Sequence, residues 1–141
     1  MEQTFFTLAD GRKVELLVAG TPQEKAVVFH HGTPGGTTTW ESWLTEVEKQ
    51  GGFAFSYSRP GYGQSDRHEG RTIIDNASDI EEILRHFGIE KTVSIGWSGG
   101  GPHALADTTL FQNVAAISIA GVGPFGASDL DFLEGMGEEN H

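Results

Sequence analysis

The sequence contains no cysteine among its 141 residues. This absence excludes a disulfide framework and thiolate chemistry, and it suits a reducing compartment. Basic residues are scarce, since 9 Lys and Arg stand against 20 Asp and Glu, and the formal net charge of −11 would repel a phosphate backbone. We therefore expect no nucleic-acid partner.

Long hydrophobic runs are also absent. No window approaches the ~18 consecutive apolar residues that a membrane span needs. The N-terminal stretch MEQTFFTLADGRK has neither the basic region nor the apolar core of a secretory signal. We expect no membrane partner and a soluble, cytoplasmic protein, and the length and 37% hydrophobic content suit a single domain over residues 1–141.

Signatures of metal or cofactor binding are missing as well. The six histidines show no H-E-x-x-H motif and no repeated ligand spacing. There is no G-x-G-x-x-G motif after the first strand of a βαβ unit, and no Walker-type Gly-Lys-Ser/Thr. The sequence therefore implies no metal and no cofactor.

Apolar patterning predicts strands that alternate with helices along most of the chain. Two short β-prone runs joined by Asp10-Gly11 predict an antiparallel hairpin over residues 4–8 and 13–18. Further strands are expected over 26–29, 53–57, 93–96 and 114–120, and helices over 39–50, from the Thr72 cap to Gly88, and over 99–109. This order predicts an α/β fold, a mostly parallel sheet with helices on both faces and an N-terminal antiparallel hairpin.

Three unusual loops each follow a predicted strand, over residues 31–38, 58–66 and 96–101. Ligands of open parallel sheets bind at the carboxyl ends of the strands. We therefore expect these loops to meet at one edge of the sheet and to form a ligand site there.

The third loop, GWSGGG over residues 96–101, places Ser98 at a predicted strand-to-helix turn. Its first five residues fit G-x-S-x-G, in which small residues two before and two after the serine let strand and helix approach closely while the hydroxyl is pushed outward. The N–H groups of the following helix lie nearby, where they could hold an oxyanion. The alternative is a plain glycine-rich connector.

The first loop, HGTPGG over residues 31–36, would complete such a site. Its glycines leave backbone N–H groups free to face a substrate oxygen, and Pro34 stiffens the chain. The N–H groups of Thr33 and Gly99 are therefore candidates for an oxyanion hole. A phosphate cradle is the alternative, but the phosphate-binding motifs are absent.

On these motifs the chain resembles the α/β-hydrolases. The matching pieces are HGTPGG, SRPGYGQSD, RHFGIEK and GWSGGGPHALA, in the order of that family. HGTPG is similar to the HGGPG loop of the proline iminopeptidase-like branch, with Thr33 in place of a glycine. The resemblance implies that Ser98 is the nucleophile, with the Thr33 and Gly99 amides as the oxyanion hole.

The same resemblance implies a partner that the sequence does not provide, because the serine needs a histidine that is itself oriented by an acid. After Ser98 only His103 and His141 remain, one on the helix that leaves the turn and one at the chain end. Packing or capping is expected for His103, and hydrogen-bonding structural roles are expected for His30 and His31. We assign no base.

No acid is assigned either. Asp129 and Asp131 follow the last strand, where some family members carry the acid, but a solvated acidic tail explains them equally. Asp66 is expected to be a turn residue. The resemblance implies an incomplete core without the cap and last strands, with residues 127–141 as the start of the cap and DFLEGMGEENH as the start of a cap helix.

Two functions remain open at this point. One is a serine hydrolase of ester, amide or peptide bonds that acts through an acyl-enzyme, with a perhydrolase using the same serine machinery. The other is a non-catalytic protein of the same fold that binds a ligand or partner. The expected substrate is a small molecule or short peptide, with Trp97 and Tyr62 either lining its pocket or packing in the core. The apolar strand over residues 114–120 would be an unpaired edge and is expected to promote self-association.

Overall fold

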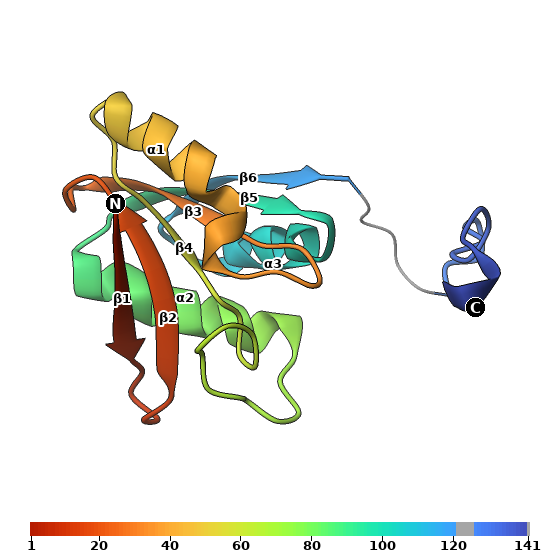
Figure 1. Ribbon diagram of the computed structural model, residues 1–141. Helices are drawn as coiled ribbons and strands as arrows, with labels where there is room; N and C mark the ends of the chain where they lie inside the picture. The colour runs from red at the N-terminus through yellow and green to blue at the C-terminus, as the bar shows by residue number, and fades with distance from the viewer. Residues whose placement is uncertain (121–125, 141) are drawn as a thin grey trace.

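The computed structural model describes residues 1–120 and 126–140. Its core is a six-stranded sheet of order β1-β2-β4-β3-β5-β6 (Figure 1). The strands are β1 (Glu2–Thr7), β2 (Lys13–Ala19), β3 (Lys25–His30), β4 (Ala54–Tyr57), β5 (Lys91–Trp97) and β6 (Asn113–Ile119). β2 pairs antiparallel with both β1 and β4, while the β4-β3-β5-β6 portion is parallel. This confirms the predicted fold class and the N-terminal hairpin.

The helices follow the strands as the patterning predicts. They are η1 (Thr37–Trp40), α1 (Glu41–Lys49), α2 (Ile73–Phe87), η2 (Ser98–Gly100), α3 (Gly101–Ala106), η3 (Asp107–Thr109) and η4 (Glu138–Asn140). α2 begins at a capping box, in which the Thr72 and Asp75 side chains bond each other's backbone N–H groups. It ends at Gly88, whose φ of 69° is the left-handed conformation that glycine accepts at little cost.

Helices cover both faces of the sheet, with α1 on one side and α2 and α3 on the other (Figure 1). The α2 face buries an apolar cluster that includes Ile80, Ile83 and Leu84 against Val28 and Phe55. On the α1 face, a second cluster forms around Leu44 and Trp40 of α1 and η1 and Phe29 of β3. Both clusters anchor the central strands, so the loops at the strand ends have a fixed base.

β6 lies at one edge of the sheet and pairs only with β5. Several of its apolar side chains are exposed to solvent, with Val114 62% and Ile117 47% exposed. The edge strand expected from the sequence is therefore present, although its start and end are each one residue earlier than predicted.

The C-terminal described segment differs from its expectation. Residues 126–140 form turns and the short η4, and no α-helix is found in them. Gly135 and Gly137 weaken helix formation in this stretch, and Gly135 has a positive φ of 82°. The helix expected from DFLEGMGEENH is thus absent from the described residues, while the assignment of residues 127–141 to a cap stays a prediction. His141 lies outside the described residues.

Candidate active site

The three loops expected to share one edge do meet there. Arg59, in the loop after β4, donates hydrogen bonds into the loop after β3, at the carbonyl oxygens of His31 and Gly32. The loop after β5 meets the same segment, because a side chain added at Gly99 would place its Cβ 2.5 Å from Thr33 Oγ1. The sheet topology therefore assembles the candidate site from parts of the chain more than 60 residues apart, about as the loop positions predict.

Ser98 has a backbone φ of 50°, one of two positive values among the described non-glycine residues. It is the first residue of the helical turn η2, directly after β5, with glycines at the two positions that G-x-S-x-G requires to be small. A Cβ at Gly96 would overlap the carbonyl oxygen of Gly100, and one at Gly100 would overlap that of His30. These close approaches explain the glycine spacing and hold Ser98 in a strained conformation.

Backbone donors lie beside Ser98. Among the described residues the Thr33 N–H finds no acceptor. A Cβ at Gly99 would lie 3.5 Å from the Thr33 nitrogen, so the backbones of Thr33 and Gly99 are close neighbours. Gly99 also belongs to the first turn of a helical segment, whose N–H groups have no partner within the helix. The backbone N–H groups of Thr33 and Gly99 thus belong to neighbouring segments, and their role as an oxyanion hole stays a prediction.

Arg59 organises the first loop, a role that the sequence patterning did not reveal. Its side chain is 1% exposed and also donates a 3.1 Å hydrogen bond to Thr33 Oγ1. Burial lowers the pKa of Arg59 from its ordinary value, but a guanidinium remains charged at neutral pH. No carboxylate among the described residues forms an ion pair with it. The hint in the sequence is an arginine two positions after the end of an apolar strand.

His31 is held by the same loop contacts. The Arg59 backbone N–H donates to His31 Nε2 at 3.0 Å, so the proton of the neutral ring is on Nδ1, which donates to the Gly32 carbonyl oxygen at 2.6 Å. Burial, with the charge of Arg59 second, lowers the pKa of His31 to about 4. The ring is neutral at pH 7 and both nitrogens are engaged, which supports the structural role expected for it.

His103 is likewise tied to the backbone of the turn. Its Nδ1–H donates to the Gly99 carbonyl oxygen at 2.9 Å, and burial lowers its pKa to about 4. Nε2 is buried and has no partner among the described residues. The ring therefore holds the carbonyl oxygen of Gly99 by a hydrogen bond, as expected of a packing or capping residue.

His30 forms a buried pair with Asp107 that the sequence patterning also did not reveal. Asp107 Oδ2 accepts a 2.8 Å bond from His30 Nε2–H and a 2.6 Å bond from the Ser94 hydroxyl, while Tyr57 donates to His30 Nδ1. His30 and Asp107 are 0% and 1% exposed. Since both ring nitrogens are used and the pair is enclosed, it connects β3 to η3 and is not available to Ser98.

The candidate acids do not join Ser98. Asp66 accepts from the Lys13 N–H at 2.7 Å, and its own N–H donates to the Lys13 carbonyl oxygen, so it ties the loop after β4 to β2 and does not form the turn expected of it. Asp129 and Asp131 are exposed in the C-terminal segment. In the described part of the chain the Ser98 hydroxyl forms no hydrogen bond, so neither a base nor an acid is found beside it there.

The two aromatic candidates for a substrate pocket line different cavities. Trp97 is 46% exposed and, with Trp43 of α1, lines a cavity of about 300 Å³. Tyr62 lines a second cavity of about 630 Å³ and packs edge-on against His31 at a ring distance of 5.0 Å. The structure therefore does not bring Trp97 and Tyr62 together in one pocket.

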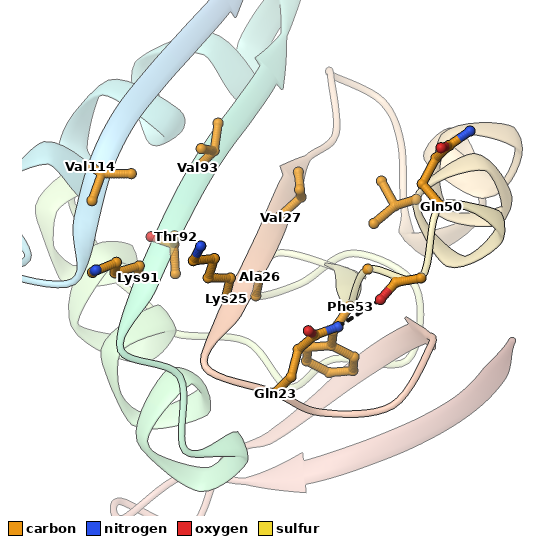
Figure 2. Close-up of a pocket in the computed structure, with 13 residues that line it drawn as sticks. Gln23, Lys25, Ala26, Val27, Gln50, Phe53, Lys91, Thr92, Val93 and Val114 are labelled. Atoms are coloured by element: carbon orange, nitrogen blue, oxygen red, sulfur yellow. Dashed lines mark hydrogen bonds between the residues drawn. The ribbon is translucent and has the colours of Figure 1, made fainter.

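A third cavity, of about 480 Å³, lies away from Ser98 (Figure 2). Lys25 and Lys91, the first residues of β3 and β5, both line it, together with Val93 and Val114. Ser98 follows the last residue of β5, so this cavity is at the opposite end of the strands. It is not part of the candidate site.

Among residues 1–120 and 126–140, no group of three or more His, Asp or Glu side chains is arranged to hold a metal ion. No helix in the same part of the chain has both the length and the apolar character to cross a membrane. The candidate site is thus built from a serine, backbone N–H groups and one buried arginine.

The sequence matches the family model for the alpha/beta hydrolase fold over residues 25–130. That range includes all three loops of the candidate site. The chain belongs to the α/β-hydrolase family. The resemblance carried by HGTPGG, SRPGYGQSD and GWSGGGPHALA is therefore confirmed at the level of the family.

Individual relatives span several activities. The chain is 24% identical over 124 residues to a bifunctional esterase/perhydrolase of Acinetobacter calcoaceticus, covering 85% of this chain and 45% of the relative. It is 32% identical over 93 residues to a probable proline iminopeptidase of Leptolyngbya boryana, covering 62% and 28%. These relatives are hydrolytic enzymes of the α/β-hydrolase superfamily, and their names cover more than one branch of it.

Solved structures agree on the fold. An epoxide hydrolase of Vigna radiata superimposes with a TM-score of 0.77 at 17% identity, covering 92% of this chain and 42% of that one. The chain spans less than half the length of the curated relatives and solved structures described here. What is shared is thus a part of the α/β-hydrolase fold.

Proposed function

We propose that the whole protein is a serine hydrolase of ester, amide or peptide bonds and that Ser98 is its nucleophile. The observation that carries this proposal is the strained Ser98, with φ of 50°, beside a Thr33 N–H that has no acceptor in the described part of the chain. A hydroxyl raised on a sharp turn next to free N–H donors is the arrangement that acyl transfer requires. The esterase and iminopeptidase names of the relatives agree with this class.

In the proposed reaction, Ser98 Oγ forms a bond to the carbonyl carbon while its proton passes to a general base. The carbonyl oxygen becomes an oxyanion, which accepts hydrogen bonds from the N–H groups of Thr33 and Gly99. The leaving alcohol or amine then takes a proton, and water releases the acyl group by the reverse steps. The base and its acid are expected from a part of the protein outside the described residues.

The alternative is a non-catalytic α/β-hydrolase-fold protein that binds a ligand at the same loops. It would explain the absence of a histidine beside Ser98 among the described residues. It would leave unexplained why the chain retains a strained serine in place of a glycine at a position with positive φ, which costs about 1 kcal/mol or more. We therefore favour the hydrolase.

A fluorophosphonate probe tests the proposal, because a serine nucleophile displaces fluoride from the phosphorus and retains the rest of the probe. We expect the whole protein to gain one adduct in its intact mass, with peptide mapping placing it on Ser98 and Ser98→Ala abolishing it. Ser94→Ala is the matched control, since Ser94 is a buried serine on β5, the strand that leads into Ser98. A whole protein that folds and gains no adduct would overturn the proposal.

The 141-residue chain gives a second comparison. Without a base, it should label much more slowly than the whole protein, because general-base catalysis contributes about 10²–10⁴-fold. Equal labelling rates would contradict the expectation that the base lies outside the described residues.

A further inference from the structure

The loop between β4 and α2, yellow-green in Figure 1, concentrates positive charge in an acidic protein. Three of the five arginines, Arg59, Arg67 and Arg71, lie within this loop. Neither Arg67 nor Arg71 forms an ion pair with any described carboxylate. The other two arginines do form such pairs, with aspartates or a glutamate at 2.6–2.8 Å. Unpaired arginines are unexpected where acidic residues outnumber basic ones by 20 to 9.

These two arginines share a cavity. Arg67 and Arg71 both line the hollow of about 630 Å³ that also includes Tyr62 and His68. His68 Nδ1 is buried and has no hydrogen-bond partner among the described residues. A buried polar atom without a partner is costly, so it is a position where a ligand atom would be stabilised.

The backbone around the hollow is fixed although the guanidinium groups are free. The N–H of Tyr62 donates to the Arg59 carbonyl oxygen at 2.9 Å, and that of Gly61 donates to the Asp66 carbonyl oxygen at 3.2 Å. Asp66 is in turn bonded on both sides to Lys13 of β2. The loop is therefore tied to the sheet, and binding would not need to order it.

The local charge favours an anion. The Arg59 guanidinium lies 5.2 Å from the centre of the Tyr62 ring, and Tyr62 lines the hollow. A buried positive charge is therefore close to the hollow. Burial lowers the pKa of His103 most, and the charge of Arg59 comes next. The charge of Arg71 also contributes, so the positive charge of Arg71 acts as far as the His103 ring. Glu69 is the one carboxylate in the lining, and it pairs with neither arginine.

We propose that this hollow binds a small molecule through a carboxylate or phosphate group, held by the guanidinium groups of Arg67 and Arg71 and by His68. The planar fork of arginine donates two parallel hydrogen bonds to such a group. The site lies next to the proposed active site, because Tyr62 separates it from His31 in the Thr33 loop. The binding of the anion does not depend on the chemistry of Ser98.

The test is a titration of the 141-residue chain with succinate and, separately, with inorganic phosphate, at constant ionic strength maintained with chloride. Nuclear magnetic resonance follows the backbone amide signals of residues 60–71 and the ring signals of His68. We expect saturable shifts confined to this loop, and the probe that saturates at lower concentration identifies the group that the site prefers.

Variants assign the binding to the named side chains. The double variant Arg67→Gln/Arg71→Gln should lower the affinity for the more tightly bound probe at least about tenfold, because charge-assisted hydrogen bonds are lost. Glu69→Gln should strengthen binding severalfold, since it removes a like charge. Arg85→Gln is the matched control, because Arg85 is an exposed arginine of α2 that pairs with Glu81, and it should leave affinity unchanged.

Two results would overturn the proposal. One is the absence of saturable shifts with both probes. The other is an equal loss of affinity in Arg85→Gln and in Arg67→Gln/Arg71→Gln, which would show a response to net charge alone. Amide signals outside the loop show whether each variant remains folded, and Ser98→Ala should bind like the unchanged chain whatever the outcome of the fluorophosphonate experiment.

Discussion

The guanidinium of Arg59 donates a hydrogen bond to the hydroxyl oxygen of Thr33, across two loops that follow different strands of the sheet. The same group donates to the carbonyl oxygens of His31 and Gly32, so it aligns three acceptors of one short segment. Within the described part of the chain the Thr33 N–H itself donates no hydrogen bond. One buried arginine therefore sets the geometry that the proposed oxyanion hole depends on.

Replacing Arg59 with lysine should destabilise the fold. Lysine keeps the charge but not the planar fork, so buried acceptors of the His31–Thr33 segment lose donors, at about 1–3 kcal/mol for each unsatisfied group. Urea unfolding of Arg59→Lys should show a free energy of unfolding lower by about 2–3 kcal/mol. Arg67→Lys, at an exposed position of the same loop, should change it by less than about 0.5 kcal/mol. A loss in Arg59→Lys no larger than that of the control would contradict this role.

Gly96 should tolerate no side chain. In Gly96→Ala the new methyl group would overlap the carbonyl oxygen of Gly100, which is backbone and cannot turn aside. We expect a loss of about 2–4 kcal/mol in urea unfolding, since strand and turn must separate. Gly88→Ala is the comparison, because a Cβ at Gly88 would meet no atom within 4 Å, and only its positive φ of 69° opposes a side chain; it should lose about 1 kcal/mol. Equal losses in the two variants would show that the close packing at Gly96 is unimportant.

The sequence predicted those parts of the fold that depend on local pattern. Thr72 and Gly88 mark the ends of α2 because capping and left-handed backbone are properties of a few neighbouring residues. The serine turn was predictable for the same reason, since Gly96 and Gly100 stand at fixed positions around Ser98.

Long-range polar contacts could not be predicted in this way. His30 and Asp107 are 77 positions apart and meet only after β3, β5 and α3 have packed together. Arg59 resembles an ordinary loop arginine until the fold buries it. The cap helix expected from DFLEGMGEENH was inferred from family resemblance, whereas the local composition, with Gly135 and Gly137, favours the turns that are found.

Acid should destabilise the fold through His31 and His103. Burial lowers the pKa of each to about 4, below the ordinary value of 6.5, so the unfolded chain binds more protons between these two values. The contribution of these two histidines to the free energy of unfolding should therefore be fully present above about pH 6.5. It should fall as the pH decreases toward 4, by about 1.4 kcal/mol per pH unit for each group. Asparagine at position 103 keeps a donor for the Gly99 carbonyl oxygen and does not titrate. The free energy of unfolding of His103→Asn should hence change less between pH 7 and pH 5, and an unchanged pH dependence would contradict the assignment.

The open edge of the sheet should promote self-association. Ile117 and Val114 of β6 are 47% and 62% exposed beside unpaired backbone groups, and an apolar edge of this kind pairs readily with another chain. Sedimentation velocity over a range of concentrations should show species larger than the monomer, and Ile117→Lys should reduce them because a charge at the edge opposes pairing. Ile74→Lys is the control, since Ile74 is 50% exposed at the start of α2, on the opposite face of the sheet. If association depends on the edge of β6, only the first variant reduces it. A chain that is monomeric at every concentration, or an equal effect of both substitutions, would exclude the edge as the cause.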